Sequence, residues 1–68
     1  MDHELFDLEV RRFLQEFGVT AQREIESAVA TAIAAGRLPG ATAVHARARL
    51  EIQALGTYFD IERDIPLE

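Results

Sequence analysis

The chain has 68 residues, no cysteine and a formal net charge of -5 at pH 7. This length holds one small domain, and the lack of cysteine excludes disulfides, zinc–thiolate sites and cysteine nucleophiles. Hydrophobic residues make up 49% of the chain, which is too many for a disordered protein. The sequence contains no run of about 18 apolar residues, so it predicts no membrane span. Because a chain without cysteine suits a reducing compartment, we expect a cytoplasmic protein. The acidic start MDHELFDLEV does not resemble a signal peptide.

Residues 2–17 are predicted to form a first helix. Asp2 can cap its first turn, and Gly18 is expected to end it in a left-handed conformation. An apolar stripe with the helical period supports this helix, formed by Phe6, Val10, Phe13, Leu14 and Phe17.

Residues 20–35 are predicted to form a second helix, with Thr20 as its N-cap and Gly36 just past its end. Its stripe is built from small and branched residues, namely Ala21, Ile25, Ala28, Val29, Ala32 and Ile33. Because Gly18 and Thr20 bound a very short connection, the two helices should form a helical hairpin.

After Gly40 the hydrophobic period changes from 3.6 to 2, which predicts strands at residues 43–54 and 57–67 joined by a turn at Gly56. The order of elements is then α-α-β-β. We expect one α+β domain over residues 1–68, with the helical hairpin packed on one face of an antiparallel β-hairpin.

Closing the turn around Leu55 and Gly56 predicts a cross-strand register with one apolar and one polar face. The apolar pairs are Ile52 with Phe59, Leu50 with Ile61, Ala46 with Ile65, and Val44 with Leu67. The polar pairs are Arg49 with Glu62, Arg47 with Asp64, the like-charged Glu51 with Asp60, and His45 with Pro66. The basic stripe of VHARARL is therefore interpreted as half of a set of ion pairs rather than as an anion-binding surface.

The residues that carry most enzyme chemistry are sparse and scattered. His3 and Asp7 have a spacing that could share a metal, but two ligands near a helix terminus make a weak site, and Ser27 has no histidine nearby in sequence. No phosphate-binding, dinucleotide-binding or nucleophile-elbow motif occurs. We therefore expect no enzyme, and we assign no catalytic, cofactor-binding or metal-binding residue.

A helix-turn-helix regulator of nucleic acid is the main alternative, because FLQEFGVTAQREIESAV has the spacing of that motif. Leu14 stands where a small residue is usual, and Glu24 stands where an apolar one is usual. The second helix would present Glu24 and Glu26 against Arg23 alone, whereas phosphate contacts require surplus positive charge. Nucleic acid is thus an unlikely partner.

The stretch VRRFLQEFGVTAQREIESAV, the following AGRLPG and the alternating strands resemble a family of short bacterial proteins of unknown function. The resemblance covers nearly the whole chain and implies the same order of elements, two helices joined by a short turn and then a β-hairpin. It departs at Ala21, where the family pattern has a serine that would complete a capping box with Glu24. The resemblance implies no activity and no site.

Geometry favours a partner for the predicted fold. Two helices side by side span roughly 20 Å, whereas two strands span only about 10 Å, so the hairpin cannot cover both apolar stripes. An isolated two-stranded sheet is also marginally stable. We expect a homodimer joined through the β-hairpin, by edge pairing or by packing of apolar faces. The protein would then be a structural or interaction module, with another protein as a possible further partner and no membrane contact.

Overall fold

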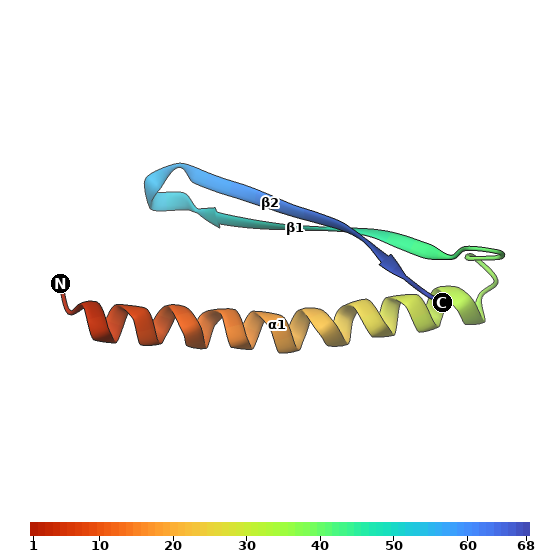
Figure 1. Cartoon of the computed structure of the whole chain (residues 1–68), viewed down its shortest axis with the longest axis horizontal. Coiled ribbons are helices and arrows are strands. Elements are labelled where there is room, and N and C mark those ends of the chain that lie inside the picture. Colours follow the sequence, from red (N-terminus) through yellow and green to blue (C-terminus); the bar gives the residue numbers. More distant parts are fainter. The chain divides into compact units, whose positions relative to one another are not determined.

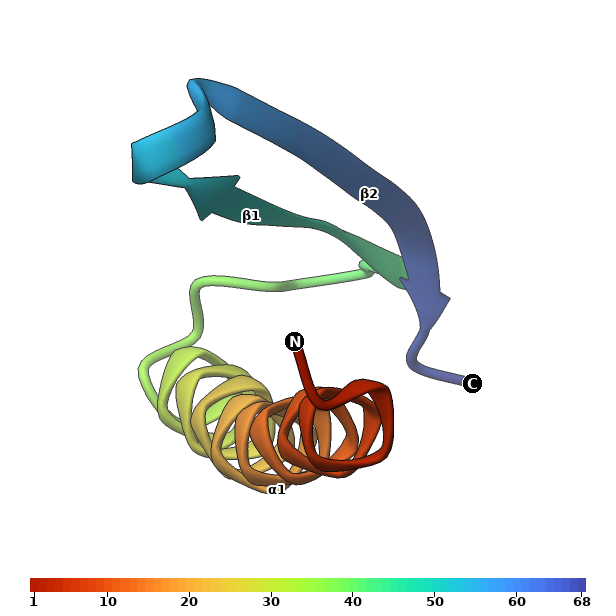
Figure 2. The same ribbon diagram turned by 90° about the vertical axis from the view of Figure 1, so that its left-hand side faces the viewer.

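The computed structural model describes residues 1–68, which divide into two compact units, Met1–Leu38 and Pro39–Glu68. The first unit is the helix α1 (His3–Ala34). The second unit is a β-hairpin of β1 (Ala43–Ile52) and β2 (Thr57–Pro66), joined through the short 3-10 helix η1 (Gln53–Leu55) (Figures 1 and 2). The predicted α+β class is confirmed, with one helix where two were expected.

The predicted helical hairpin is wrong, because α1 runs without interruption through residues 18–20. Gly18 does not adopt the left-handed conformation that would end a helix; only Gly36, Gly40 and Gly56 have positive φ. An internal glycine lowers helix stability by only about 0.5–1 kcal/mol, and no proline stands near it to break the helix. The apolar stripe also stays in phase across Gly18, so both halves prefer one straight axis.

Both ends of α1 are capped as the sequence predicts. The Asp2 side chain accepts a hydrogen bond from the Leu5 N–H at 3.0 Å, and Glu4 complements the positive end of the helix dipole. At the other end, Gly36 (φ 67°) and Arg37 donate backbone hydrogen bonds to Ile33 and Ala32, at 3.0 and 2.9 Å. These two bonds form a Schellman motif, which satisfies carbonyl groups that the helix leaves open.

The hairpin confirms the two predicted strands and changes the turn between them. β1 ends at Ile52, two residues early, because Gln53–Leu55 form η1 and Gly56 closes the turn with φ 62°. The Gly56 N–H donates to the Gln53 carbonyl at 3.1 Å. Four residues thus lie between the paired ends Ile52 and Thr57.

The wider turn moves the predicted register by two positions. Leu50 faces Phe59, Ala48 faces Ile61, Ala46 faces Arg63 and Val44 faces Ile65. On the polar face, Arg49 faces Asp60, Arg47 faces Glu62, His45 faces Asp64 and Glu51 faces Tyr58. A shift of two keeps every side chain on its predicted face, since strand side chains alternate with a period of two. The predicted pairs are nevertheless wrong, including the unfavourable pair of Glu51 with Asp60.

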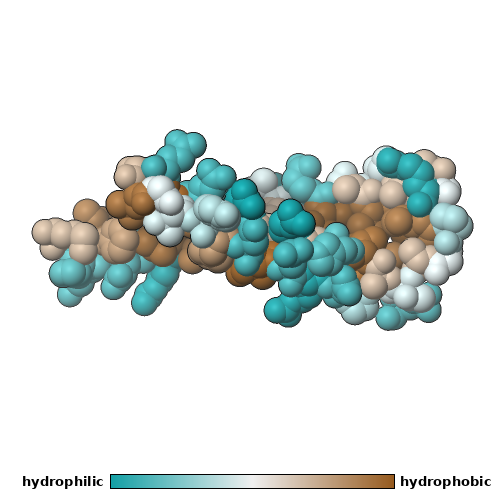
Figure 3. Space-filling view, turned by 90° about the horizontal axis from the view of Figure 1, so that it is seen from above, coloured by the Kyte–Doolittle hydropathy of each residue, from teal (hydrophilic) through white to brown (hydrophobic).

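No side chain of either unit is buried. Hydrophobic residues lie at the surface between the polar ones (Figure 3). On α1, Phe6 and Phe13 are 53% and 57% exposed, and on the hairpin Ile61 is 58% exposed. A lone helix and a two-stranded sheet each bury too little apolar surface to be stable alone.

Candidate functional site

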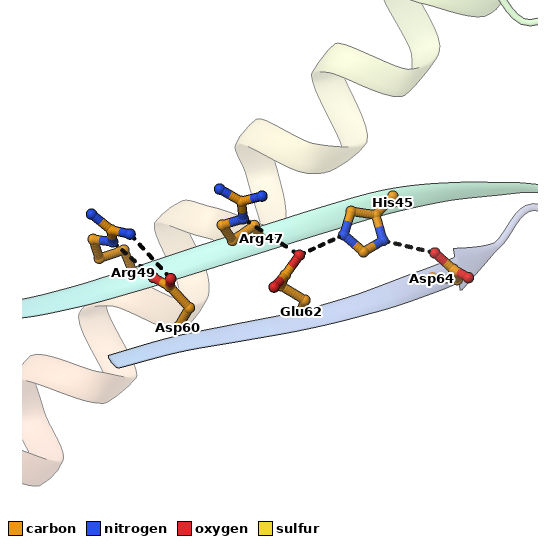
Figure 4. A network of polar contacts seen from close by, with 6 residues as sticks. All are labelled: His45, Arg47, Arg49, Asp60, Glu62 and Asp64. Atoms are coloured by element: carbon orange, nitrogen blue, oxygen red, sulfur yellow. Dashed lines mark hydrogen bonds and ion pairs between the residues drawn. The ribbon is translucent and has the colours of Figure 1, made fainter. Parts of the chain in front are cut away.

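The densest group of functional side chains lies on the polar face of the hairpin. We call it the polar ladder: three basic side chains from β1 alternate along the strand and meet three carboxylates from β2 (Figure 4). Its members are His45, Arg47, Arg49, Asp60, Glu62 and Asp64. The strand period of two places all six on one face, and the observed register brings each cation opposite a carboxylate.

His45 holds the open end of the polar ladder. Its Nδ1 lies 2.8 Å from Asp64 Oδ1, and its Nε2 lies 2.9 Å from Glu62 Oε1. An ionised carboxylate only accepts hydrogen bonds, so both contacts can form together only when both ring nitrogens carry a proton, which is the imidazolium form. The hydrogen bonds to Glu62 and then Asp64 raise the pKa of His45 above its ordinary value.

Arg49 forms the strongest ion pair of the polar ladder. Its Nε and one terminal nitrogen donate to the two oxygens of Asp60 at 2.8 and 3.1 Å, a two-point contact that fixes both groups. The hydrogen bond from Arg49 lowers the pKa of the Asp60 carboxyl. The guanidinium carbon also lies 4.5 Å from the ring centroid of Tyr58, a cation–π contact that covers one face of the charge.

The middle of the polar ladder links its two ends. Arg47 Nε lies 3.4 Å from Glu62 Oε1, the same oxygen that accepts from His45. Glu62 is therefore shared by two cations, and His45 is shared by two carboxylates (Figure 4). All these pairs are largely exposed to solvent, and exposed pairs contribute about 0–1 kcal/mol each.

The polar ladder has little capacity for acid–base or nucleophilic chemistry. Both nitrogens of His45 are engaged by carboxylates, and each carboxylate is engaged by a cation. No hydroxyl or thiol nucleophile takes part. No group of three or more His, Cys, Asp or Glu side chains is arranged to hold a metal ion. A shallow, open hollow lies at the turn end, lined by Arg49, Tyr58 and turn residues.

The two edges of the hairpin carry opposite charges. The Leu67 N–H donates to the Thr42 carbonyl at 2.8 Å, which makes this a hydrogen-bonded pair one position beyond the strands. Because such pairs alternate, the polar-face residues point their backbone groups outward to the free edges. The β1 edge therefore presents His45, Arg47 and Arg49, and the β2 edge presents Asp60, Glu62 and Asp64. Pro66 also faces the β2 edge and offers no N–H there.

The predicted register placed the basic and acidic residues of the polar ladder on one face of the hairpin but paired them with the wrong partners. The prediction that the basic stripe pairs with carboxylates of the second strand is confirmed, but Arg49 pairs with Asp60 and Arg47 with Glu62. His45, predicted to face Pro66, was missed as a member. A charge signal could have found it: the observed register gives three opposite-charge pairs, whereas the predicted one contains a like-charge pair.

The helix pair whose spacing could share a metal, which we did not assign as a site, gains no further ligand. His3 and Asp7 lie at the start of α1, and the structure assembles no metal-binding cluster around them. Ser27 lies in the second half of α1. None of these three residues is part of the polar ladder.

Comparison with known families decides where the chain belongs. The model of the family of unknown function DUF6494 matches residues 1–68. The chain belongs to the DUF6494 family. No curated protein and no solved structure gives a significant match. The helix of this DUF6494 protein lacks the long apolar stretch that a bilayer crossing requires.

Proposed function

We propose that this DUF6494 protein is a non-catalytic protein–protein interaction module that works as a homodimer. The observation that carries the proposal is the hairpin: two strands alone, with one apolar face and both edges free. A two-stranded sheet needs a further layer or further strands to be stable in water. A second copy supplies an identical apolar face at equal concentration.

The apolar face of the hairpin is the better surface for this contact than its edges. Symmetric pairing of two β2 edges would bring Asp60, Glu62 and Asp64 against the same three residues of the second copy. Symmetric pairing of two β1 edges about Arg47 would bring Arg47 against Arg47 and His45 against Arg49. Like charges directly opposite are destabilising, and free edges of natural sheets use charge to block pairing.

Pairing of a β1 edge with a β2 edge would match the charges but would not form a closed dimer. Such a contact is heterologous, so it leaves one edge of each kind free and continues into a filament. The apolar face has no such conflict. It consists of Val44, Ala46, Ala48, Leu50, Ile52, Phe59, Ile61 and Ile65, interrupted only by Arg63.

The structure does not favour the alternative of a helix-turn-helix regulator. That motif needs two helices crossing at a turn, and residues 18–20 lie inside α1. The polar ladder also neutralises the arginines that a wing would offer to phosphates.

Sedimentation equilibrium of the wild-type protein at micromolar concentration tests the proposal. We expect the mass of a dimer. Ile61→Lys places a charge on the apolar face and should shift the protein toward the monomer, while Glu51→Lys introduces the same side chain on the polar face and should leave the dimer intact. A wild-type monomer that is folded by circular dichroism at this concentration would overturn the proposal.

A further inference from the structure

The uninterrupted course of α1 places one apolar stripe along nearly its whole length. We call it the helix stripe. Its spacing is symmetric about the middle of the helix: steps of four, three and four residues precede a central step of four, and the same steps follow it. Its members are Phe6, Val10, Phe13, Phe17, Ala21, Ile25, Ala28 and Ala32. Such a near-regular repeat keeps all eight residues on one side of a straight helix.

The two halves of the helix stripe differ in size. The first half holds three phenylalanines and a valine, and the second half holds three alanines and one isoleucine. A helix turned end over end about the centre of the stripe matches each residue of the first half with one of the second. The matched levels are Phe6 with Ala32, Val10 with Ala28, Phe13 with Ile25, and Phe17 with Ala21.

We propose that α1 packs against α1 of a second copy in an antiparallel pair, with the centre of the helix stripe on the two-fold axis. This inference rests on the proposed homodimer and assigns it a second interface. Each level then pairs a large side chain with a smaller one, so the two helices keep an even separation along the stripe. Antiparallel helix dipoles also favour this direction over the parallel one.

A parallel pair of the same helices would pack poorly. It would place phenylalanine against phenylalanine at three levels and alanine against alanine at three others. The separation that the phenylalanines require leaves gaps between the alanines, and such gaps forfeit contact energy. The helix stripe is therefore complementary to an antiparallel copy of itself and not to a parallel copy.

The exposed apolar area of two helix stripes is comparable with the area that a small stable dimer interface buries. Phe6, Phe13 and Phe17 are each about half exposed, which leaves roughly 100 Å² of each ring to bury. Six rings in two copies supply about half of the roughly 1,200 Å² of a small stable interface. Val10 and Ile25 on the stripe are each 38% exposed and add apolar area, as do the flanking Leu14 and Ile33.

Spin labels measure the direction of the helices. The chain has no cysteine, so Glu9→Cys and Glu16→Cys, both at exposed positions, each accept one nitroxide. At 1.5 Å per residue, antiparallel pairing separates the two labels at position 9 by about 30 Å and the two at position 16 by only about 10–15 Å. We expect dipolar electron paramagnetic resonance of the labelled dimer to give this long and short pair of distances.

The other outcomes separate this inference from the homodimer itself. A sedimenting dimer with equal, short distances at both positions has parallel helices and overturns the antiparallel pair. A dimer with both distances beyond about 40 Å has its helix stripes covered by something else, such as each chain's own hairpin, and also overturns it. In both cases the homodimer stands. A labelled protein that sediments as a monomer overturns both proposals.

Discussion

At the scale of single residues, His45 determines the chemistry of the polar ladder. It is the one member whose charge changes near neutral pH, and its charged form is held by Glu62 and Asp64 from β2. Arg47 lies beside the same Glu62 oxygen and partly offsets that carboxylate. Protonation of His45 and pairing of the two strands are therefore linked.

We predict that the hairpin loses stability as the pH rises past the folded pKa of His45. Because that pKa is raised, the extra stability is fully present below the unfolded value near 6.5 and disappears as the pH rises through the folded value. Asp60 has a lowered pKa, so its contribution changes only in acid, outside this window.

Urea unfolding at about pH 5.5 and about pH 8.5 checks this prediction against His45→Gln, which keeps a polar side chain without a titrating ring. The wild-type protein should lose more stability than the variant over this interval. Equal losses would mean that His45 is not held as an imidazolium by the two carboxylates.

At the scale of elements, the faces of the strands follow from sequence, while the register and the helix count do not. Alternation fixes which side of the sheet Leu50 and Arg49 occupy, but a shift of two residues leaves that pattern unchanged. Only the turn distinguishes the two registers, and η1 widens it by two residues. The polar ladder was therefore predictable as a face and not as a set of contacts.

The number of helices depends on whether Gly18 and Gly36 each end a helix. Gly36 is followed by Pro39, lies after the last apolar residue of the stripe and ends α1 in a Schellman motif. Gly18 has neither signal: the stripe continues in phase on both sides, with Phe17 and Ala21 one turn apart. A glycine ends a helix where its left-handed conformation is stabilised by capping contacts, and residue type alone does not reveal this.

We predict opposite effects for Gly18→Ala and Gly36→Ala. At Gly18 an added Cβ meets nothing within 4 Å and φ is helical, so alanine should stabilise the protein by about 0.5–1 kcal/mol. At Gly36 the space is equally open but φ is +67°, so alanine should destabilise by about 1–2 kcal/mol. Thermal unfolding followed by circular dichroism measures both. Destabilisation by Gly18→Ala would instead indicate a break in the helix at that residue.

At the scale of the whole molecule, both units lack a buried hydrophobic core. α1 carries a long apolar stripe and the hairpin carries an apolar face, yet neither has a buried side chain. A chain of 68 residues without disulfides has few other sources of stability. Self-association through the apolar surfaces would cover both of them with copies of the same sequence. A two-fold contact of this kind closes on itself, whereas pairing of a β1 edge with a β2 edge would continue into a filament.

Folding and association should therefore be a single process, and we predict that the melting temperature depends on protein concentration. For a dimer that dissociates on unfolding, each tenfold rise in concentration adds about 1.4 kcal/mol per dimer. For a chain of this size, that corresponds to a rise of roughly 3–5 °C in melting temperature. Circular dichroism at the helix band, from about 1 to about 100 µM, follows α1 directly. Ile61→Lys should melt at a lower temperature than Glu51→Lys at every concentration, because only the first alters the apolar face. A melting temperature independent of concentration would show that one chain folds without a second copy.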